Sequence, residues 1–312
     1  MEIRDLDYFL ACTRHRSFAA AARAVHIVPS AMSLAIGRLE QELGAPLFDR
    51  GGAGGCLTLT EQGSALQQGA EAIMTAVQAA RDGVAEAGGQ VRGTVVLGST
   101  LHTGRLDLAA VFAGLRERHP GVVVQLRQAR GGSVGMTEAV RDGSLDIALT
   151  AMTGAVSGIA VHQLFSEPMV FVCQPGHRLG QRTQLVASDL GDEEILRPPP
   201  GWGSRAAIDE ALGETGSACE IADYRLTARL VRTGFAPAVV PASAMSAGML
   251  EGLCALPVEG LCWTLSAVVS ADRRLTAATE ALLHALVQGT AECAPNLPAL
   301  SSPSPAGGPR PG

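Results

Sequence analysis

The stretch that decides the fold runs from residue 17 to residue 50 and reads SFAAAARAVHIVPSAMSLAIGRLEQELGAPLFDR. Ser17 is a good N-cap for a helix over 18–25, because its side-chain oxygen can accept a bond from a free backbone N–H. Pro29 suits the first position of a second helix, where a missing N–H costs nothing. The buried side of that second helix is predicted from apolar residues at steps of four, three and four, namely Met32, Ile36, Leu39 and Leu43. Two short helices joined by a tight turn predict a helix-turn-helix.

The segments on either side complete a small N-terminal unit over residues 1–60. Before the helix pair, Leu6, Phe9, Leu10 and Thr13 fit one face of a further helix. After it, the glycine-rich run 51–56 and the short apolar stretch 57–59 predict a β-wing. The glycine run lacks the Gly-Lys-Ser/Thr ending of a phosphate-binding loop, so a nucleotide site is excluded.

A long helix is expected next, over 61–89, with Thr60 as its cap. Apolar residues at alternating steps of four and three give it a heptad stripe, which is typical of a coiled coil. We interpret the stripe as a dimerisation surface made of Leu66, Ala70, Ile73, Val77, Ala80 and Val84. Packing of the same stripe on its own chain is the alternative, since several of its members are alanine and bury little area.

Beyond Gly88-Gly89 the pattern changes to strands that alternate with helices, which favours parallel α/β architecture. About 200 residues of this kind suggest one domain over 90–294 that is divided into two lobes, the second at about 160–262. From residue 295 to 312 proline, serine and glycine dominate, and a disordered tail is expected. The fold class is therefore α+β and multidomain: a winged helix-turn-helix, a linker helix and a two-lobed α/β domain.

Composition excludes several classes of protein. With 312 residues, 47% of them hydrophobic, the chain has ample material for two cores and no run long enough for a membrane helix. The N-terminus lacks the layout of a signal peptide, and the seven cysteines include no Cys-x-x-Cys pair. We therefore expect a soluble cytoplasmic protein that contacts no membrane and carries neither a metal nor another cofactor.

Charge is informative only locally. The net charge is −6, yet all 24 basic residues are arginine, and the segment between Tyr8 and Leu39 holds four of them and no carboxylate. Such a patch can contact nucleic acid or can simply be a solvated face.

Several motifs together resemble the LysR-type transcriptional regulators. These are the helix start Pro29-Ser30-Ala31-Met32-Ser33 and the run over 43–50, Leu-Gly-Ala-Pro-Leu-Phe-Asp-Arg. Residues 92–95, 142–148 and 231–234 with Val240-Pro241 resemble motifs of the family's effector domain. The resemblance implies a homodimer or homotetramer that binds promoter DNA through its winged helix. It also implies a domain like the periplasmic binding proteins, in which a small ligand between the lobes changes how the oligomer binds a promoter.

In such a protein the helix that begins at Pro29 enters the major groove. The DNA-contacting residues are then Arg16, Ser17, Arg23, Pro29, Ser30, Ala31, Ser33, Leu34, Gly37, Arg38 and Arg50. This chain departs from the family at Val28, where Ser or Thr is usual, at Leu34, Ala35 and Gly37, where polar or basic residues are usual, and in a wing without charge. Fewer phosphate contacts predict a shallower dependence of DNA affinity on salt.

The ligand site is expected where strands lead into helices in both lobes. Hydroxyls and free N–H groups at such turns suit an anion such as a carboxylate, and Trp202 could form an aromatic wall. With the family resemblance, the effector-binding residues are Ser99, Thr100, Leu101, Thr150, Trp202, Gly203, Ser204 and Tyr224.

Other functions remain as alternatives. The chain could be a ligand-binding or partner-binding protein with degenerate DNA binding. It could also be a serine hydrolase that uses Ser133, because residues 131–135 fit Gly-x-Ser-x-Gly, but no histidine-glycine oxyanion segment precedes them. Redox sensing by Cys173, Cys219, Cys254 or Cys262 is a further alternative, although no basic cluster near them predicts a reactive thiolate. We expect a regulator and not an enzyme.

Overall fold

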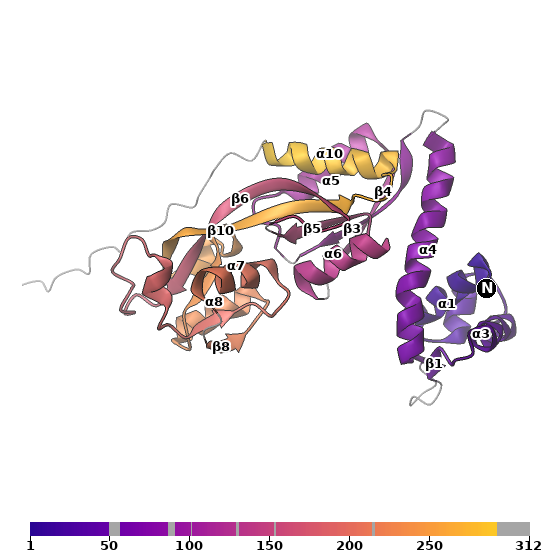
Figure 1. Ribbon diagram of the computed structural model, residues 1–312, viewed down its shortest axis with the longest axis horizontal. Helices are drawn as coiled ribbons and strands as arrows, with labels where there is room; N and C mark the ends of the chain where they lie inside the picture. Colours follow the sequence, from indigo (N-terminus) through magenta and orange to yellow (C-terminus); the bar gives the residue numbers. More distant parts are fainter. Residues whose placement is uncertain are drawn as a thin grey trace, which may run out of the picture.

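The computed structural model describes residues 1–49, 57–86, 91–100, 102–128, 131–152, 154–213 and 216–291. A small N-terminal unit is followed by one long helix and then by a larger domain built on a single sheet (Figure 1). The expected tail at 295–312 and most of the expected wing lie outside the described residues.

The N-terminal unit is a helix-turn-helix with a short hairpin. Its elements are α1 (Ile3–His15), α2 (Phe18–Ala24), α3 (Pro29–Leu43), β1 (Phe48–Asp49) and β2 (Thr58–Leu59). Ser17 caps α2 by accepting a bond from the backbone N–H of Ala20 at 3.5 Å, and Pro29 opens α3, as the sequence predicted. Gly44 ends α3 in the left-handed conformation at φ 70°, where glycine is strongly preferred.

The buried face of α3 differs from the prediction at one position. Met32, Ile36 and Leu39 are buried as expected, but Leu43 is 43% exposed and Ala35 is buried in its place. Leu43 lies on the same face of the helix as the buried residues, but the core of the unit does not extend to the last turn of α3. Its side chain therefore stays exposed.

The long helix α4 (Glu61–Glu86) begins after Thr60, whose Oγ1 accepts a bond from the N–H of Gly63 at 2.9 Å. Leu66 and Ala70 pack into the core of the N-terminal unit, as in the alternative in which the stripe covers its own chain. Ile73, in contrast, is 39% exposed, and Ala80 is exposed as well. The side chain of Val84 lies outside the described part, and dimerisation through this stripe stays a prediction.

The larger domain contains an eight-stranded sheet with the strand order β4-β3-β5-β10-β6-β9-β7-β8. The strands are β3 (Arg92–Ser99), β4 (Gly121–Gln128), β5 (Ile147–Ala151), β6 (Ile159–Cys173), β7 (Ile195–Arg197), β8 (Ser217–Glu220), β9 (Ala238–Pro241) and β10 (Cys254–Ser270).

The sheet is mixed, so the expectation of parallel architecture was wrong for its centre. β3 lies parallel to β4 and β5, and β7 lies parallel to β8 and β9. The two long strands β6 and β10 pair antiparallel with each other, and both also have antiparallel outer neighbours. Because β6 and β10 run through both lobes, they join the lobes through continuous backbone hydrogen bonding (Figure 1).

Helices divide the domain into two lobes. The first lobe carries β3 to β5 with α5 (Leu108–Arg118) and α10 (Ala277–Ala291) on one face and α6 (Gly132–Asp142) on the other (Figure 1). The second lobe carries β7 to β9 with α7 (Gly203–Leu212), α8 (Tyr224–Thr233), α9 (Ala247–Leu250) and the short 3-10 turns η1 (Ala187–Leu190) and η2 (Ala242–Ala244). Aspartates cap α5 and α8 through Asp107 and Asp223, and each accepts two backbone N–H bonds.

Within the described residues, no single helix is both long and apolar enough to cross a membrane. The pair α2 and α3 passes that test only jointly, by length and composition, and is bent by 106° at the turn.

Two substitutions on α3 separate stability from surface function. Ile36→Ala should destabilise the N-terminal unit by about 2–5 kcal/mol, because it empties a fully buried site. Leu34→Ala on the same helix should change stability by less than about 0.5 kcal/mol, since Leu34 is 66% exposed. Thermal and denaturant unfolding of both variants measures this. Equal losses of stability would contradict the assigned faces of α3.

Candidate nucleic-acid interface and ligand cleft

The outward face of α3 combines small polar side chains with one apolar and one basic residue. Ser30, Leu34 and Arg38 follow each other at steps of four and are all exposed, and Ser33 lies beside them half-buried. A Cβ added at Gly37 would meet nothing within 4 Å, so this part of the helix is open to close approach. The face matches the surface predicted for base contacts.

The remaining predicted DNA contacts differ in their exposure or lie outside the described residues. Arg16 and Arg23 are exposed, whereas Ser17 and Ala31 are half-buried. Arg16 adopts the left-handed conformation, and its carbonyl accepts the N–H of Leu57 at 2.9 Å, which ties the helix turn to the hairpin. The hydroxyl of Ser17 is occupied by its cap bond. Arg50 lies outside the described residues.

In the larger domain the lobes meet where α6 and α7 begin. Ser133 Oγ accepts the N–H of Gly203 at 3.2 Å, and the N–H of Val134 donates to the carbonyl of Gly201 at 3.2 Å. A Cβ at Gly203 would lie 1.8 Å from the carbonyl oxygen of Ala151, and one at Gly132 would lie 2.6 Å from that of Gly201. Only glycine permits this approach of the two backbones. Residues 132–134, 151 and 201–203 are called the interlobe seam below.

A cavity of about 570 Å³, the interlobe cavity, opens beside this seam. Its size is in the usual range for small-molecule sites. Trp202, Trp263 and Met152 give it an apolar wall, and Arg141, Glu138 and Arg205 give it a charged rim. Residues from α6 and α7 line it together, so a molecule bound there would contact both lobes at once.

Salt bridges hold α7 in place at this cavity. Asp209 pairs with the fully buried Arg197 at the end of β7 and with Arg205 one turn earlier on α7. Arg205 also donates to Glu220 on β8 at 2.9 Å. The buried guanidinium of Arg197 therefore has its countercharge on α7, and this pairing fixes the orientation of the helix start that carries Trp202 and Gly203.

A second set of polar side chains crosses between the lobes around His102, and we call it the His102 cluster. Nε2 of His102 lies 3.1 Å from Ser243 Oγ, and Ser243 donates to Glu167 Oε1 at 2.6 Å. Because the hydroxyl has only one proton to donate, His102 must supply the other bond from a protonated Nε2. Glu167 is buried, so the bond from Ser243 compensates it in part for lost hydration.

Aromatic contacts complete the His102 cluster. The imidazole lies 5.4 Å from the ring of Tyr224 and 5.3 Å from that of Trp263, between centroids. Burial raises the pKa of Tyr224 to about 12, while its hydrogen bond with Ser204 acts in the opposite direction. Tyr224 therefore stays neutral at physiological pH. Trp263 also lines the interlobe cavity, so the cavity and the cluster share one wall.

The structure distributes the predicted effector residues over these features. Trp202 and Gly203 line the cavity, whereas Ser204 and Tyr224 belong to the His102 cluster. Thr100 Oγ1 donates to the carbonyl of His102 at 2.6 Å, and Ser99 Oγ donates to the carbonyl of Thr100. Leu101 lies outside the described residues.

Thr150 differs from the other predicted residues. Its hydroxyl is completely buried and, among the described residues, has no hydrogen-bond partner. Such a group costs free energy unless something pairs with it. It directly precedes Ala151 of the interlobe seam, whose carbonyl lies against Gly203.

Sequence reasoning missed the residues that connect the lobes. His102, Glu167 and Ser243 come from three distant elements, and no spacing relates them. The one available signal was the carboxylate of Glu167 two residues before the apolar run 169–173, since a buried acid needs partners. Ser133 was considered only as a nucleophile, whereas the structure shows it as an acceptor for the N–H of Gly203.

One of the cysteines considered for redox sensing, Cys173, is buried. Burial raises the pKa of Cys173 to about 12, so its thiol stays protonated and unreactive. In the described part of the chain, no three His, Cys, Asp or Glu side chains gather in a way that could hold a metal ion.

The chain combines a helix-turn-helix, whose second helix is exposed, with a two-lobed domain that contains a cavity, and a long helix joins the two. This is the architecture of a DNA-binding regulator that carries its ligand-binding domain in the same chain. Residues 3–64 match the family described as bacterial regulatory helix-turn-helix protein, lysR family, and residues 88–291 match the LysR substrate binding domain. The chain belongs to the LysR family of transcriptional regulators and has that family's DNA-binding and effector-binding domains.

Individual relatives agree with this assignment. The regulator CfxR of Cupriavidus necator is 29% identical over 67% of this chain, which spans 64% of that relative's length. The RuBisCO operon transcriptional regulator of Acidithiobacillus ferrooxidans is 27% identical over 95% of this chain and 97% of its own. The crystal structure of full-length CbnR with its target DNA matches with a TM-score of 0.63 at 20% identity, over 94% of this chain and 100% of that one. These relatives are regulators and not enzymes, which removes the hydrolase alternative.

The seam predicts that Gly203 tolerates no side chain. Gly203→Ala should force α7 away from Ala151 and open the lobes, because the added Cβ would overlap a carbonyl oxygen. Amide hydrogen exchange at residues 133–135 and 203–206 should then rise. Gly248→Ala is the control, since a Cβ there meets nothing within 4 Å. Unchanged exchange in Gly203→Ala would show that the lobes are not held by this contact.

Proposed function

We propose that this LysR-family regulator binds promoter DNA in a sequence-specific manner and that a small effector in the interlobe cavity changes this binding. The observation that carries the proposal is the cavity itself, which is lined by residues of α6 and α7 from opposite lobes. A ligand that contacts both lobes favours whichever lobe arrangement it fits best, and any DNA-binding state linked to that arrangement is favoured with it.

At the DNA, α3 would lie in the major groove with its outward face on the base edges. Ser30 and Ser33 are suited to hydrogen bonds with bases or phosphates, and Leu34 to the methyl group of thymine. Arg16, Arg23, Arg38 and Arg50 would hold phosphates. Support comes from the exposure of the described members of this set and from the open approach at Gly37.

At the effector site, two helix N-termini carry partial positive charge toward the same space, which favours an anionic ligand such as a carboxylate. Ser133 and the N–H of Gly203 already form a donor–acceptor pair across the lobes, so a carboxylate could replace the hydroxyl as acceptor. Trp202 and Trp263 would contact the apolar part of the ligand. The hydroxyl of Thr150, which has no hydrogen-bond partner in the described part of the chain, lies one residue from the seam and would gain a partner if the ligand draws the lobes into a new arrangement.

The regulator would act in the cytoplasm as a homodimer or a pair of dimers. Ile73, Val77 and Ala80 form the part of the α4 stripe that the N-terminal unit leaves uncovered. A second copy of α4 is the surface with the matching spacing.

One test concerns the phosphate contacts. Arg23→Gln should lower the slope of log K against log salt by about 0.9, the effect of losing one phosphate contact. Arg178→Gln is the matched control, because Arg178 is an exposed arginine of the second lobe that pairs with Glu193. Fluorescence anisotropy with one promoter duplex at several salt concentrations measures both slopes. Equal slopes for the two variants would remove Arg23 from the interface.

A second test concerns the effector. Trp202→Ala should weaken binding of whichever carboxylate stabilises the wild-type protein by at least about tenfold, because it removes an aromatic wall of the cavity. DNA affinity without effector should stay unchanged. Phe235→Ala provides a control, since this aromatic residue is 56% exposed on the second lobe and does not line the cavity. Thermal shift with a panel of small carboxylates finds the ligand, and calorimetry compares the variants. Unaltered binding in Trp202→Ala would place the effector elsewhere.

A further inference from the structure

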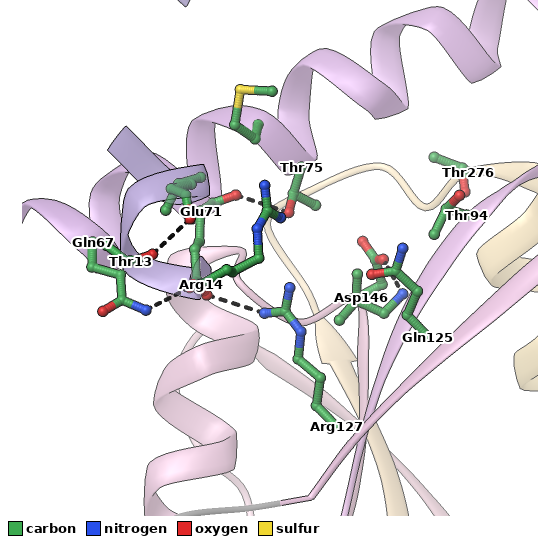
Figure 2. A pocket seen from close by; sticks show the side chains of 13 residues that line it. Thr13, Arg14, Gln67, Glu71, Thr75, Thr94, Gln125, Arg127, Asp146 and Thr276 are labelled. Carbon is green, nitrogen blue, oxygen red and sulfur yellow. Dashed lines mark hydrogen bonds and ion pairs between the residues drawn. The ribbon is translucent and has the colours of Figure 1, made fainter. Parts of the chain in front are cut away.

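A second cavity, of about 620 Å³, lies between the N-terminal unit with its linker helix and the first lobe, and we call it the interdomain cavity. Side chains of α1 and α4 form one wall, and β3 and β4 form the other (Figure 2). The interdomain cavity shares no lining residue with the interlobe cavity. A molecule bound there would touch the DNA-binding part and the ligand domain simultaneously.

Most of the residues that line the interdomain cavity have polar or charged side chains. Leu10, Met74 and Val96 are its apolar members. The other lining residues are Thr13, Arg14, Gln67, Glu71, Thr75, Thr94, Gln125, Arg127, Asp146 and Thr276. The charged and hydroxyl groups of this lining need hydrogen-bond partners when a ligand displaces water, which favours a ligand that itself carries polar groups.

Both carboxylates in the interdomain cavity already accept bonds from the protein. Glu71 on α4 accepts from Gln67 at 2.9 Å and from Arg127 on β4 at 3.0 Å. Asp146 accepts the backbone N–H of Val96 at 2.8 Å. These acids are therefore engaged in holding the walls, and they offer little to a cationic ligand.

The cationic groups retain more donor capacity. Arg127 uses one nitrogen for both Glu71 and the carbonyl of Ser144, and a guanidinium carries five N–H donors. Arg14, in the last turn of α1, reaches Asp7 only at 4.0 Å. Figure 2 shows both guanidinium groups facing the space between the helices and the strands. One arginine comes from the N-terminal unit and the other from the first lobe.

We propose that the interdomain cavity is a second ligand site, which takes a small oxyanion, a carboxylate or a phosphate ester, between Arg14 and Arg127. Guanidinium groups form strong paired bonds with both kinds of oxyanion. Hydroxyls of Thr94 and Thr276 and the amide of Gln125 surround the remaining volume and suit a hydroxylated ligand. The bound anion would cross-link the N-terminal unit to the first lobe and so restrict the positions α3 can take on DNA.

Calorimetric titration of the full chain with citrate and, separately, with inorganic phosphate, both at constant ionic strength, tests this site. Arg14→Gln and Arg127→Gln should each weaken binding by at least about tenfold, because each removes one charge-assisted contact. Both arginines are exposed, so the variants should fold as the parent does. Arg4→Gln is the matched control, since it removes an exposed arginine of the same helix that pairs with Glu2.

Further variants separate this site from the other anion-binding surfaces. Trp202→Ala and Arg23→Gln should leave the binding unchanged, because they alter only the interlobe cavity and the DNA-binding face. Binding of citrate alone would identify a carboxylate ligand, and binding of phosphate alone would identify a phosphate ester. Hydrogen exchange at residues 67–75 and 123–128 should fall when the anion is bound. The proposal is overturned if neither anion binds or if both bind Arg14→Gln and Arg127→Gln as tightly as the parent.

Discussion

The two lobes of the ligand domain meet at glycines, whose lack of a side chain lets the two backbones approach closely. At Gly132, Gly201 and Gly203 one backbone lies against another, and two hydrogen bonds cross the gap. This close approach brings the first turns of α6 and α7 together and creates the cavity beside them. The salt bridges of Arg197 and Arg205 to Asp209 then hold α7 at that position. Any ligand that widens or tightens this contact acts on both lobes.

The linker helix α4 contacts both the N-terminal unit and the larger domain with its first half. Its first half completes the core of the N-terminal unit through Leu66, Ala70 and Met74. Glu71, on the same stretch, pairs with Arg127 of the first lobe. One segment of helix therefore contacts both the N-terminal unit and the first lobe, and under our proposal a shift of the first lobe would reach the N-terminal unit through it. The exposed Ile73 and Ala80 on this helix belong to the surface that we propose for a second copy of the chain.

The sequence predicted local structure well, because caps and periodicity act over a few residues. Ser17, Pro29 and Thr60 sit at the helix starts that their chemistry favours. It failed where long-range packing decides. Leu43 lies on the predicted face of α3 but is exposed, because no core residues cover the last turn of the helix. The antiparallel pairing of β6 with β10 depends on the direction in which the chain re-enters the sheet, and local sequence does not encode that direction.

For the candidate site, too, residues in local motifs were predictable and contacts between distant segments were not. The family resemblance led to Trp202 and Gly203, which line the cavity. The partnership of His102, Ser243 and Glu167 joins three distant elements, and no local pattern encodes it.

The measurement that tests the account most directly is fluorescence anisotropy of the full chain with its own upstream intergenic DNA and with a scrambled duplex, at low and moderate salt. We predict preference for the upstream DNA by about a thousandfold and a footprint of two half-sites. Equal affinity for both duplexes at every salt concentration would contradict the account and would identify a ligand-binding or partner-binding protein with degenerate DNA binding.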